Sequence, residues 1–76
     1  MDHIEDWFFT KNGIYIEISD KVNHVDLNYM NDRDQELISR YLIAFADDTI
    51  LFITTHNSIQ ILEFLLYTCI QVLNWV

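Results

Sequence analysis

Several residue types are scarce in this chain. It has one glycine, no proline, one cysteine and only four lysine or arginine residues among 76. The lone cysteine, Cys69, excludes an intrachain disulfide, and the acidic N-terminal residues 1–6 lack the basic and apolar segments of a signal peptide. We therefore expect a reducing, cytoplasmic location.

The scarcity of basic residues leaves a strong negative charge. Twelve acidic residues give a formal net charge of −8, while 51% of the residues are hydrophobic. That apolar content predicts a folded chain rather than a disordered one. The charge repels nucleic-acid phosphates and attracts basic proteins, so we expect a basic protein partner and no direct binding of nucleic acid.

The length limits the architecture and the chemistry. We expect residues 1–76 to form a single domain, too small for an enzyme with its own substrate cleft. The sequence contains no motif of a catalytic triad, and the spacings of His3, His24 and His56 match no zinc site. We therefore predict a non-enzymatic protein with no catalytic residues, no metal and no cofactor.

The N-terminal half contains a β-hairpin pattern. Aromatic and β-branched residues at 7–10 and 14–18 flank Lys11-Asn12-Gly13, where Asn-Gly favours a tight turn. A second turn is expected at Asp20-Lys21, followed by a third strand over the alternating residues 24–29. Capping residues from Asn31 onward predict a short helix from Asp34 to Arg40.

The C-terminal half is more apolar. Residues 41–46 and 49–54 flank Asp47-Asp48 and are apolar on both faces, which predicts two central strands joined at the aspartates. From Asn57 or Ser58 to Val76 the chain has no glycine or proline, so we expect a helix of about five turns.

Together these patterns predict an α+β fold, with an antiparallel sheet of four to five short strands and one long C-terminal helix packed across it. One helix side, formed by Ile59, Leu62, Leu66, Ile70 and Leu73, would cover the sheet. The remaining apolar residues need another surface, so we predict a homodimer or a hydrophobic partner site there. These residues are Ile61, Phe64, Leu65, Val72 and Trp75.

The string Phe45-Ala46-Asp47-Asp48 resembles the Y/F-A-D-D hairpin of the reverse-transcriptase palm, and the similarity covers residues 42–75 with the following helix. The resemblance implies that Asp47 and Asp48 would bind Mg²⁺ in a polymerase. The upstream aspartate strand, the nucleotide-binding motif, the fingers and the thumb of that family are missing from this chain. The implied identity is an inactive palm fragment, and Asp-Asp as a simple polar turn is the alternative.

The small size and the charge are similar to those of acidic phage-type inhibitors that mimic DNA. We expect such a protein to block a basic nucleic-acid-binding protein or nuclease of its host, in the host cytoplasm if a phage encodes it, by presenting carboxylates in place of phosphates. The candidate contacts are Asp20, Asp26, Asp32, Asp34, Glu36, Asp47 and Asp48.

Other interpretations remain open from the sequence. An immunity, antitoxin or adaptor protein would instead bind through the apolar helix and hairpin surfaces. Residues 59–76 also resemble a membrane tail anchor in length, although Glu63 and the polar stripe beside it oppose insertion, so no membrane partner is expected. The acids could also form a solvated face that only maintains solubility.

Overall fold

The computed structural model describes residues 4–49 and 51–74, and its first feature is the predicted hairpin. Strands β1 (Glu5–Thr10) and β2 (Gly13–Ile18) are antiparallel, with Phe8 opposite Tyr15. Gly13 has a φ of 138°, which an L side chain rarely adopts. The Thr10 hydroxyl donates to the Gly13 carbonyl at 3.1 Å and accepts from the Asn12 amide at 3.1 Å. The hairpin predicted from Asn-Gly is confirmed.

The third strand, β3 (Lys21–His24), pairs with β2. It is shorter than the predicted strand over residues 24–29 and begins three residues before it in the sequence. Its turn residues are Ser19 and Asp20, with φ values of 52° and 64°, rather than Asp20 and Lys21. Two consecutive positive φ values match the twist of a two-residue hairpin turn. Beyond His24 the predicted strand is wrong: Asp26 accepts a hydrogen bond from the Asn28 amide at 2.9 Å, and this local turn takes the chain out of the sheet.

Replacing Asp20 by glycine should stabilise the fold. Glycine accepts a φ of 64° without the Cβ clash, so we expect Asp20→Gly to raise the free energy of unfolding by about 0.5–1 kcal/mol. Asp48→Gly removes the same charge at an exposed residue without a positive φ, and should lower stability by a similar amount. Urea denaturation of both variants measures the difference; equal changes would contradict the strained turn.

Helix α1 (Asp32–Phe45) replaces one of the predicted strands. Asn31 caps it, its side chain accepting from the Asp34 amide at 2.8 Å, as the capping residues indicated. The predicted helix ended at Arg40, and the predicted strand over residues 41–46 is wrong. Helical spacing places Tyr41 and Leu42 on the same buried face as Leu37 and Ile38, so the core favours continuing the helix.

Strand β4 (Leu51–Thr55) lies at an edge of the sheet rather than at its centre. It pairs antiparallel with β1, and its residues alternate between half-buried and exposed. Because residues 41–45 are helical, no hairpin forms around Asp47-Asp48. The two aspartates lie instead in the loop between α1 and β4, where the Asp47 carbonyl accepts from the Lys11 amide at 3.3 Å.

The last element is helix α2 (Ser58–Leu73), which Asn57 caps by accepting from the Gln60 amide at 3.2 Å. Its C-cap, Asn74, is left-handed with a φ of 52°. The predicted continuation through Trp75 and Val76 falls outside the described residues. The described residues therefore form two helices and a four-stranded antiparallel sheet in the order β3-β2-β1-β4.

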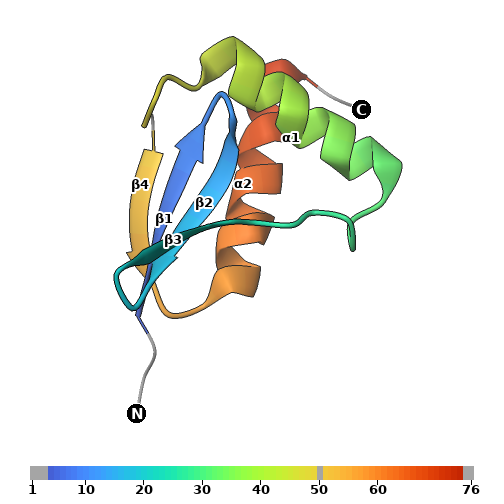
Figure 1. Cartoon of the computed structure of the whole chain (residues 1–76). Coiled ribbons are helices and arrows are strands. Elements are labelled where there is room, and N and C mark those ends of the chain that lie inside the picture. The colour runs from blue at the N-terminus through green and yellow to red at the C-terminus, as the bar shows by residue number, and fades with distance from the viewer. Residues whose placement is uncertain (1–3, 50, 75–76) are drawn as a thin grey trace.

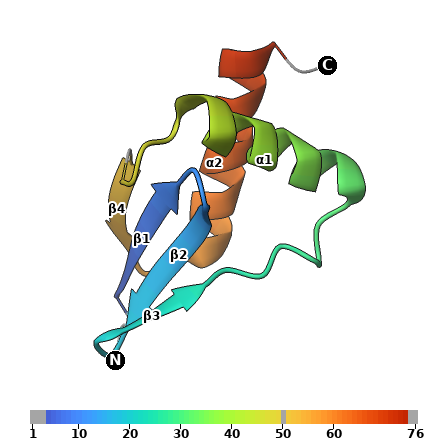
Figure 2. The same ribbon diagram turned by 45° about the horizontal axis from the view of Figure 1, so that its top comes forward.

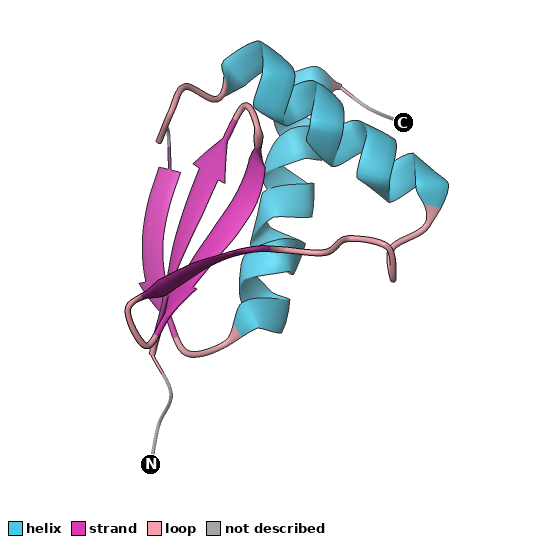
Figure 3. Ribbon diagram, in the orientation of Figure 1, coloured by secondary structure: helices cyan, strands magenta, loops and turns pink. Residues whose placement is uncertain are grey.

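Both helices lie on the same face of the sheet, and α1 crosses α2 (Figures 1 and 2). The core fills the space between the layers. Leu65 and Cys69 of α2 and Ile38 of α1 are fully buried there with Phe9 of β1. The other face of the sheet has neither helix over it (Figure 3), so the fold is a two-layer α+β arrangement with one uncovered sheet surface.

Candidate protein-binding surfaces

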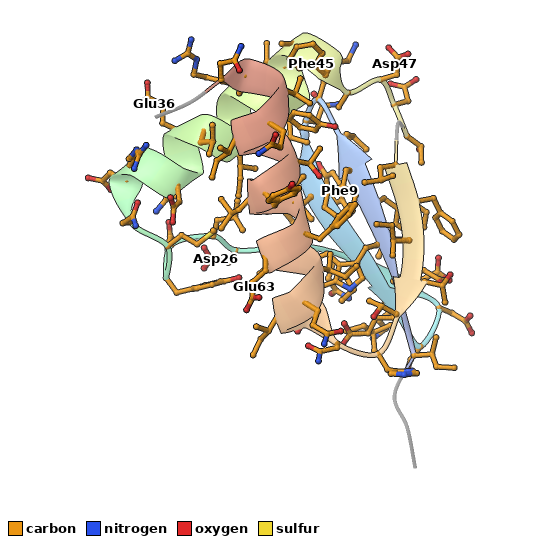
Figure 4. The ribbon with its side chains drawn as sticks, turned by 180° about the vertical axis from the view of Figure 1, so that it is seen from behind. Phe9, Asp26, Glu36, Phe45, Asp47 and Glu63 are labelled. Carbon is orange, nitrogen blue, oxygen red and sulfur yellow. The ribbon has the colours of Figure 1, made fainter. Side chains whose placement is uncertain are left out.

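The seven acids that the sequence singled out do not share one face. Asp26, Asp32, Asp34 and Glu36 follow the chain from the end of β3 into the first turns of α1, a group that we call the α1 acidic segment. Asp47 and Asp48 follow the other end of α1, about 20 Å away for a 14-residue helix (Figure 4). Asp20 occupies the β2–β3 turn.

Hydrogen bonds of the chain itself hold two of the four carboxylates of the α1 acidic segment in place. Asp26 accepts from the Asn28 amide, and Asp34 accepts from the Asn31 side-chain amide at 3.2 Å. Asp26, Asp32 and Glu36 are exposed, and within residues 4–49 and 51–74 none of these acids is held in an ion pair with a basic side chain. Their negative charge is therefore available to a partner. Asp32 and Asp34 lie in the first turn of α1, where their negative charges stabilise the helix by interacting with its dipole.

The buried side of α2 differs from the predicted one. Ile61 and Leu65, assigned to a partner surface, are 6% and 0% exposed and belong to the core. Ile59 and Ile70, assigned to cover the sheet, are exposed instead. The reason is rotation about the helix axis: the buried side is centred on Ile61, Leu65 and Cys69, which follow one another at intervals of four.

Two of the five predicted partner residues on α2 do reach solvent. Phe64 is 51% exposed and Val72 is 44% exposed, while Trp75 lies outside the described residues. The polar residues of the predicted stripe lie between the exposed apolar ones, since Gln60, Glu63, Tyr67, Gln71 and Asn74 are all exposed. The exposed side of α2 is therefore mixed in polarity rather than a continuous apolar seam.

The uncovered face of the sheet carries a row of four rings, one from each strand. Phe8 of β1 lies opposite both Phe52 of β4 and Tyr15 of β2, and Tyr15 lies opposite His24 of β3. The Phe8 and Phe52 ring centres are 5.1 Å apart, and those of Tyr15 and His24 are 5.2 Å apart. Phe52 is 53% exposed. We call these four residues the aromatic row.

A second row of side chains runs beside the aromatic row on the same face, two residues further along each strand. Asp6 of β1 lies opposite Glu17 of β2 and Thr54 of β4, and the Thr54 hydroxyl donates to Asp6 at 2.9 Å. Glu17 in turn lies opposite Val22 of β3. The uncovered face therefore combines solvent-accessible rings with two carboxylates.

The sequence indicated a hairpin surface only for the apolar interaction module, and did not distinguish the two faces of the hairpin. The signal was present: with Thr10 opposite Gly13, strand alternation puts Trp7 and Phe9 on one face and Asp6 and Phe8 on the other. Nothing in the two strands alone indicates which face the helices cover. That choice follows from packing against α1 and α2, whose buried residues form one core cluster with Trp7 and Phe9.

Two shallow depressions accompany these surfaces. One, of about 310 Å³, lies on the uncovered face and is lined by Phe8, Thr10, Tyr15, Val22 and Thr49. The other, of about 630 Å³, separates the 24–28 segment from α1, with Lys11, His24, Asp26, Gln35 and Ser39 among its lining residues. Both are open to solvent, whereas sites for small substrates typically enclose most of the ligand surface.

Cys69 is the strongest nucleophile candidate by residue type, but it is fully buried on α2. Burial raises the pKa of its thiol to about 11, so the neutral form is held inside the core. In the part of the chain that the structure describes, no three His, Cys, Asp or Glu side chains converge as a metal site. Nor does any helix of that part have the length and apolar character needed to cross a membrane.

Comparison of this chain with protein-family models, with curated proteins and with solved structures gives no match. Among the surfaces of this chain, the α1 acidic segment has exposed charge and the uncovered sheet face has an exposed ring, Phe52.

Proposed function

We propose that this chain is a non-enzymatic binding protein that occupies the basic, nucleic-acid-binding surface of another protein, as a phage-type inhibitor of a host protein would. The observation that carries the proposal is the α1 acidic segment, in which Asp26, Asp32 and Glu36 are exposed and, among the described residues, no basic side chain pairs with its carboxylates. A cationic groove that binds phosphates offers the complementary charge.

The charge of the whole chain supports the same partner class. With a net charge of −8, the chain attracts a basic protein before contact and repels nucleic acid. The carboxylates then compete with phosphates for the same lysine and arginine side chains. Association by this mechanism is fast and is weakened by salt, because screening shortens the range of the attraction.

The proposed contact is narrower than the seven acids selected from the sequence. Asp26, Asp32, Asp34 and Glu36 form it, because they follow one continuous segment. Asp47 and Asp48, at the opposite end of α1, and Asp20, in the β2–β3 turn, contribute long-range attraction only.

An interaction module that binds through apolar contacts is the second candidate. It is favoured by the exposure of Ile59, Phe64 and Phe52, at 68%, 51% and 53%. This candidate includes homodimerisation through the exposed side of α2. A reducing cytoplasm is the proposed location for both candidate functions. The two candidates differ in their response to salt, since apolar contacts are not screened.

The test begins with affinity capture from bacterial lysate and continues with a competition assay. A captured DNA-binding protein is purified, loaded with fluorescent duplex DNA and titrated with this chain. We expect the chain to displace the duplex, and its direct affinity for the captured protein, measured without duplex, to be at least tenfold weaker at about 300 mM than at about 50 mM salt. Simultaneous binding of duplex and chain would contradict mimicry, and a direct affinity indifferent to salt would favour the apolar module.

Two triple variants locate the contact. Asp26→Asn, Asp32→Asn and Glu36→Gln neutralise the α1 acidic segment and retain an oxygen to accept the hydrogen bond at Asp26. Asp20→Asn, Asp47→Asn and Asp48→Asn remove the same charge elsewhere. Each exposed ion pair is worth up to about 1 kcal/mol, so we expect the first variant to compete about tenfold less well and the second to change less than about threefold. Equal losses would show that net charge alone matters.

A further inference from the structure

We propose that the uncovered sheet face is a second contact surface, which binds arginine side chains of an extended segment of the partner protein. The inference rests on the proposed function in one respect, namely that the partner is basic. It assigns a different surface and a specific side-chain chemistry, and it is tested separately from the α1 acidic segment.

The aromatic row offers rings on which an arginine side chain can stack. Phe52, Phe8, Tyr15 and His24 cross all four strands in register, and their rings form two neighbouring pairs, Phe8 with Phe52 and Tyr15 with His24. The outer ring, Phe52, is 53% exposed although phenylalanine gains from burial. A planar guanidinium group stacks on such rings and is attracted by their negative faces.

The neighbouring carboxylates offer a partner for the charge of that side chain. Asp6 and Glu17 lie opposite each other two residues along from Phe8 and Tyr15 on the same face. An arginine stacked on the rings can therefore pair with a carboxylate in the next row. Arginine suits this surface better than lysine, because its fork of donors pairs with a carboxylate while its flat face lies on a ring.

The same charges disfavour the other occupants of the face. A second copy of the chain would bring Asp6 and Glu17 against its own carboxylates, with a net charge of −8 on each molecule. A nucleic-acid strand would find rings for stacking, but its phosphates would meet Asp6 and Glu17. A basic peptide segment can stack its arginine side chains on the rings and pair them with the carboxylates.

The test uses three eight-residue peptides that alternate threonine with arginine, lysine or uncharged citrulline. Each is titrated into the full chain at low salt, and the affinity is measured by fluorescence polarisation while amide NMR shifts locate the site. We expect the arginine peptide to bind several-fold tighter than the lysine peptide, the citrulline peptide to bind weakest, and the shifts to fall on β1, β2 and β4.

Matched variants test the surface. Phe52→Ala should weaken binding of the arginine peptide about fivefold, whereas Phe64→Ala, which removes a ring of similar exposure from α2, should leave it unchanged. Asp6→Asn with Glu17→Gln should weaken it about tenfold. Urea denaturation of each variant verifies that it folds.

Three results would overturn the inference: equal affinity in the Phe52 and Phe64 variants, shifts confined to the α1 acidic segment, or a dimer in sedimentation that Phe52→Ala dissociates. The second result would leave the proposed function intact, because the peptide would then have found the other acidic surface. Failure of the duplex competition, with peptide binding retained on the sheet, would instead remove the proposed function.

Discussion

Ile61→Ala is expected to lower the free energy of unfolding by about 2–5 kcal/mol, whereas Ile59→Ala should cost less than about 1 kcal/mol. The two isoleucines lie two residues apart on α2 and would lose the same atoms. Ile61 is 6% exposed and packs into the core, so its truncation leaves a cavity. Ile59 is 68% exposed, so its truncation leaves none.

The size of the domain makes this contrast easy to measure. A 76-residue chain at about 0.05–0.15 kcal/mol per residue has a total stability of about 4–11 kcal/mol. Loss of Ile61 would therefore remove a large share of it. Chemical denaturation with circular dichroism measures both variants. A larger loss for Ile59→Ala would mean that the helix face assigned from the sequence, with Ile61 directed to a partner, is the correct one.

Alkaline pH should destabilise the protein through Cys69. The buried thiol has a pKa of about 11, against 9.0 for an ordinary thiol. Below pH 9 the thiol is neutral in both states and this contribution is fully present. Between pH 9 and pH 11 the unfolded chain ionises first, so the free energy of unfolding should fall by about 2 kcal/mol over this interval.

Cys69→Ala isolates that effect from the titration of tyrosine and lysine. Urea denaturation in the presence of a reductant, at several pH values from 8 to 11, should show a steeper fall for the natural chain than for the variant. Burial also raises the pKa of Tyr41, which adds to the fall in both proteins. Parallel curves for the two proteins would show that Cys69 does not remain neutral in the folded state.

Local sequence features predicted the parts of the fold that local chemistry controls. Asn12-Gly13 between two β-branched runs indicated the first hairpin because few residues other than glycine accept a φ of 138°. Asn31 and Asn57 are found as helix caps because their side chains accept from backbone amides that lack a partner inside the helix.

The predictions failed where an apolar run fits two structures. Residues 41–46 have the composition of a buried strand, and periodicity cannot distinguish a short buried strand from a buried helix segment. Tyr41 and Leu42 are helical because Leu37 and Ile38 already place that face of α1 against α2. Once residues 41–45 are helical, the segment after Asp47-Asp48 pairs with β1 at the edge of the sheet instead of with residues 41–46.

Some features of the two binding surfaces follow from the sequence, and others depend on the tertiary structure. The sequence alone determined the net charge of −8, the hairpin register that pairs Asp6 with Glu17, and the cap that places Asp32 and Asp34 in the first turn of a helix. These depend on residue identity and on neighbours along the chain. The tertiary structure decided that both helices cover the Trp7 and Phe9 face, which leaves Phe52 exposed and Phe8 and Tyr15 half-buried on the other face, and separates Asp47 from Glu36. Side-chain alternation offers two faces to any strand pair, and only packing against distant segments selects which one is buried.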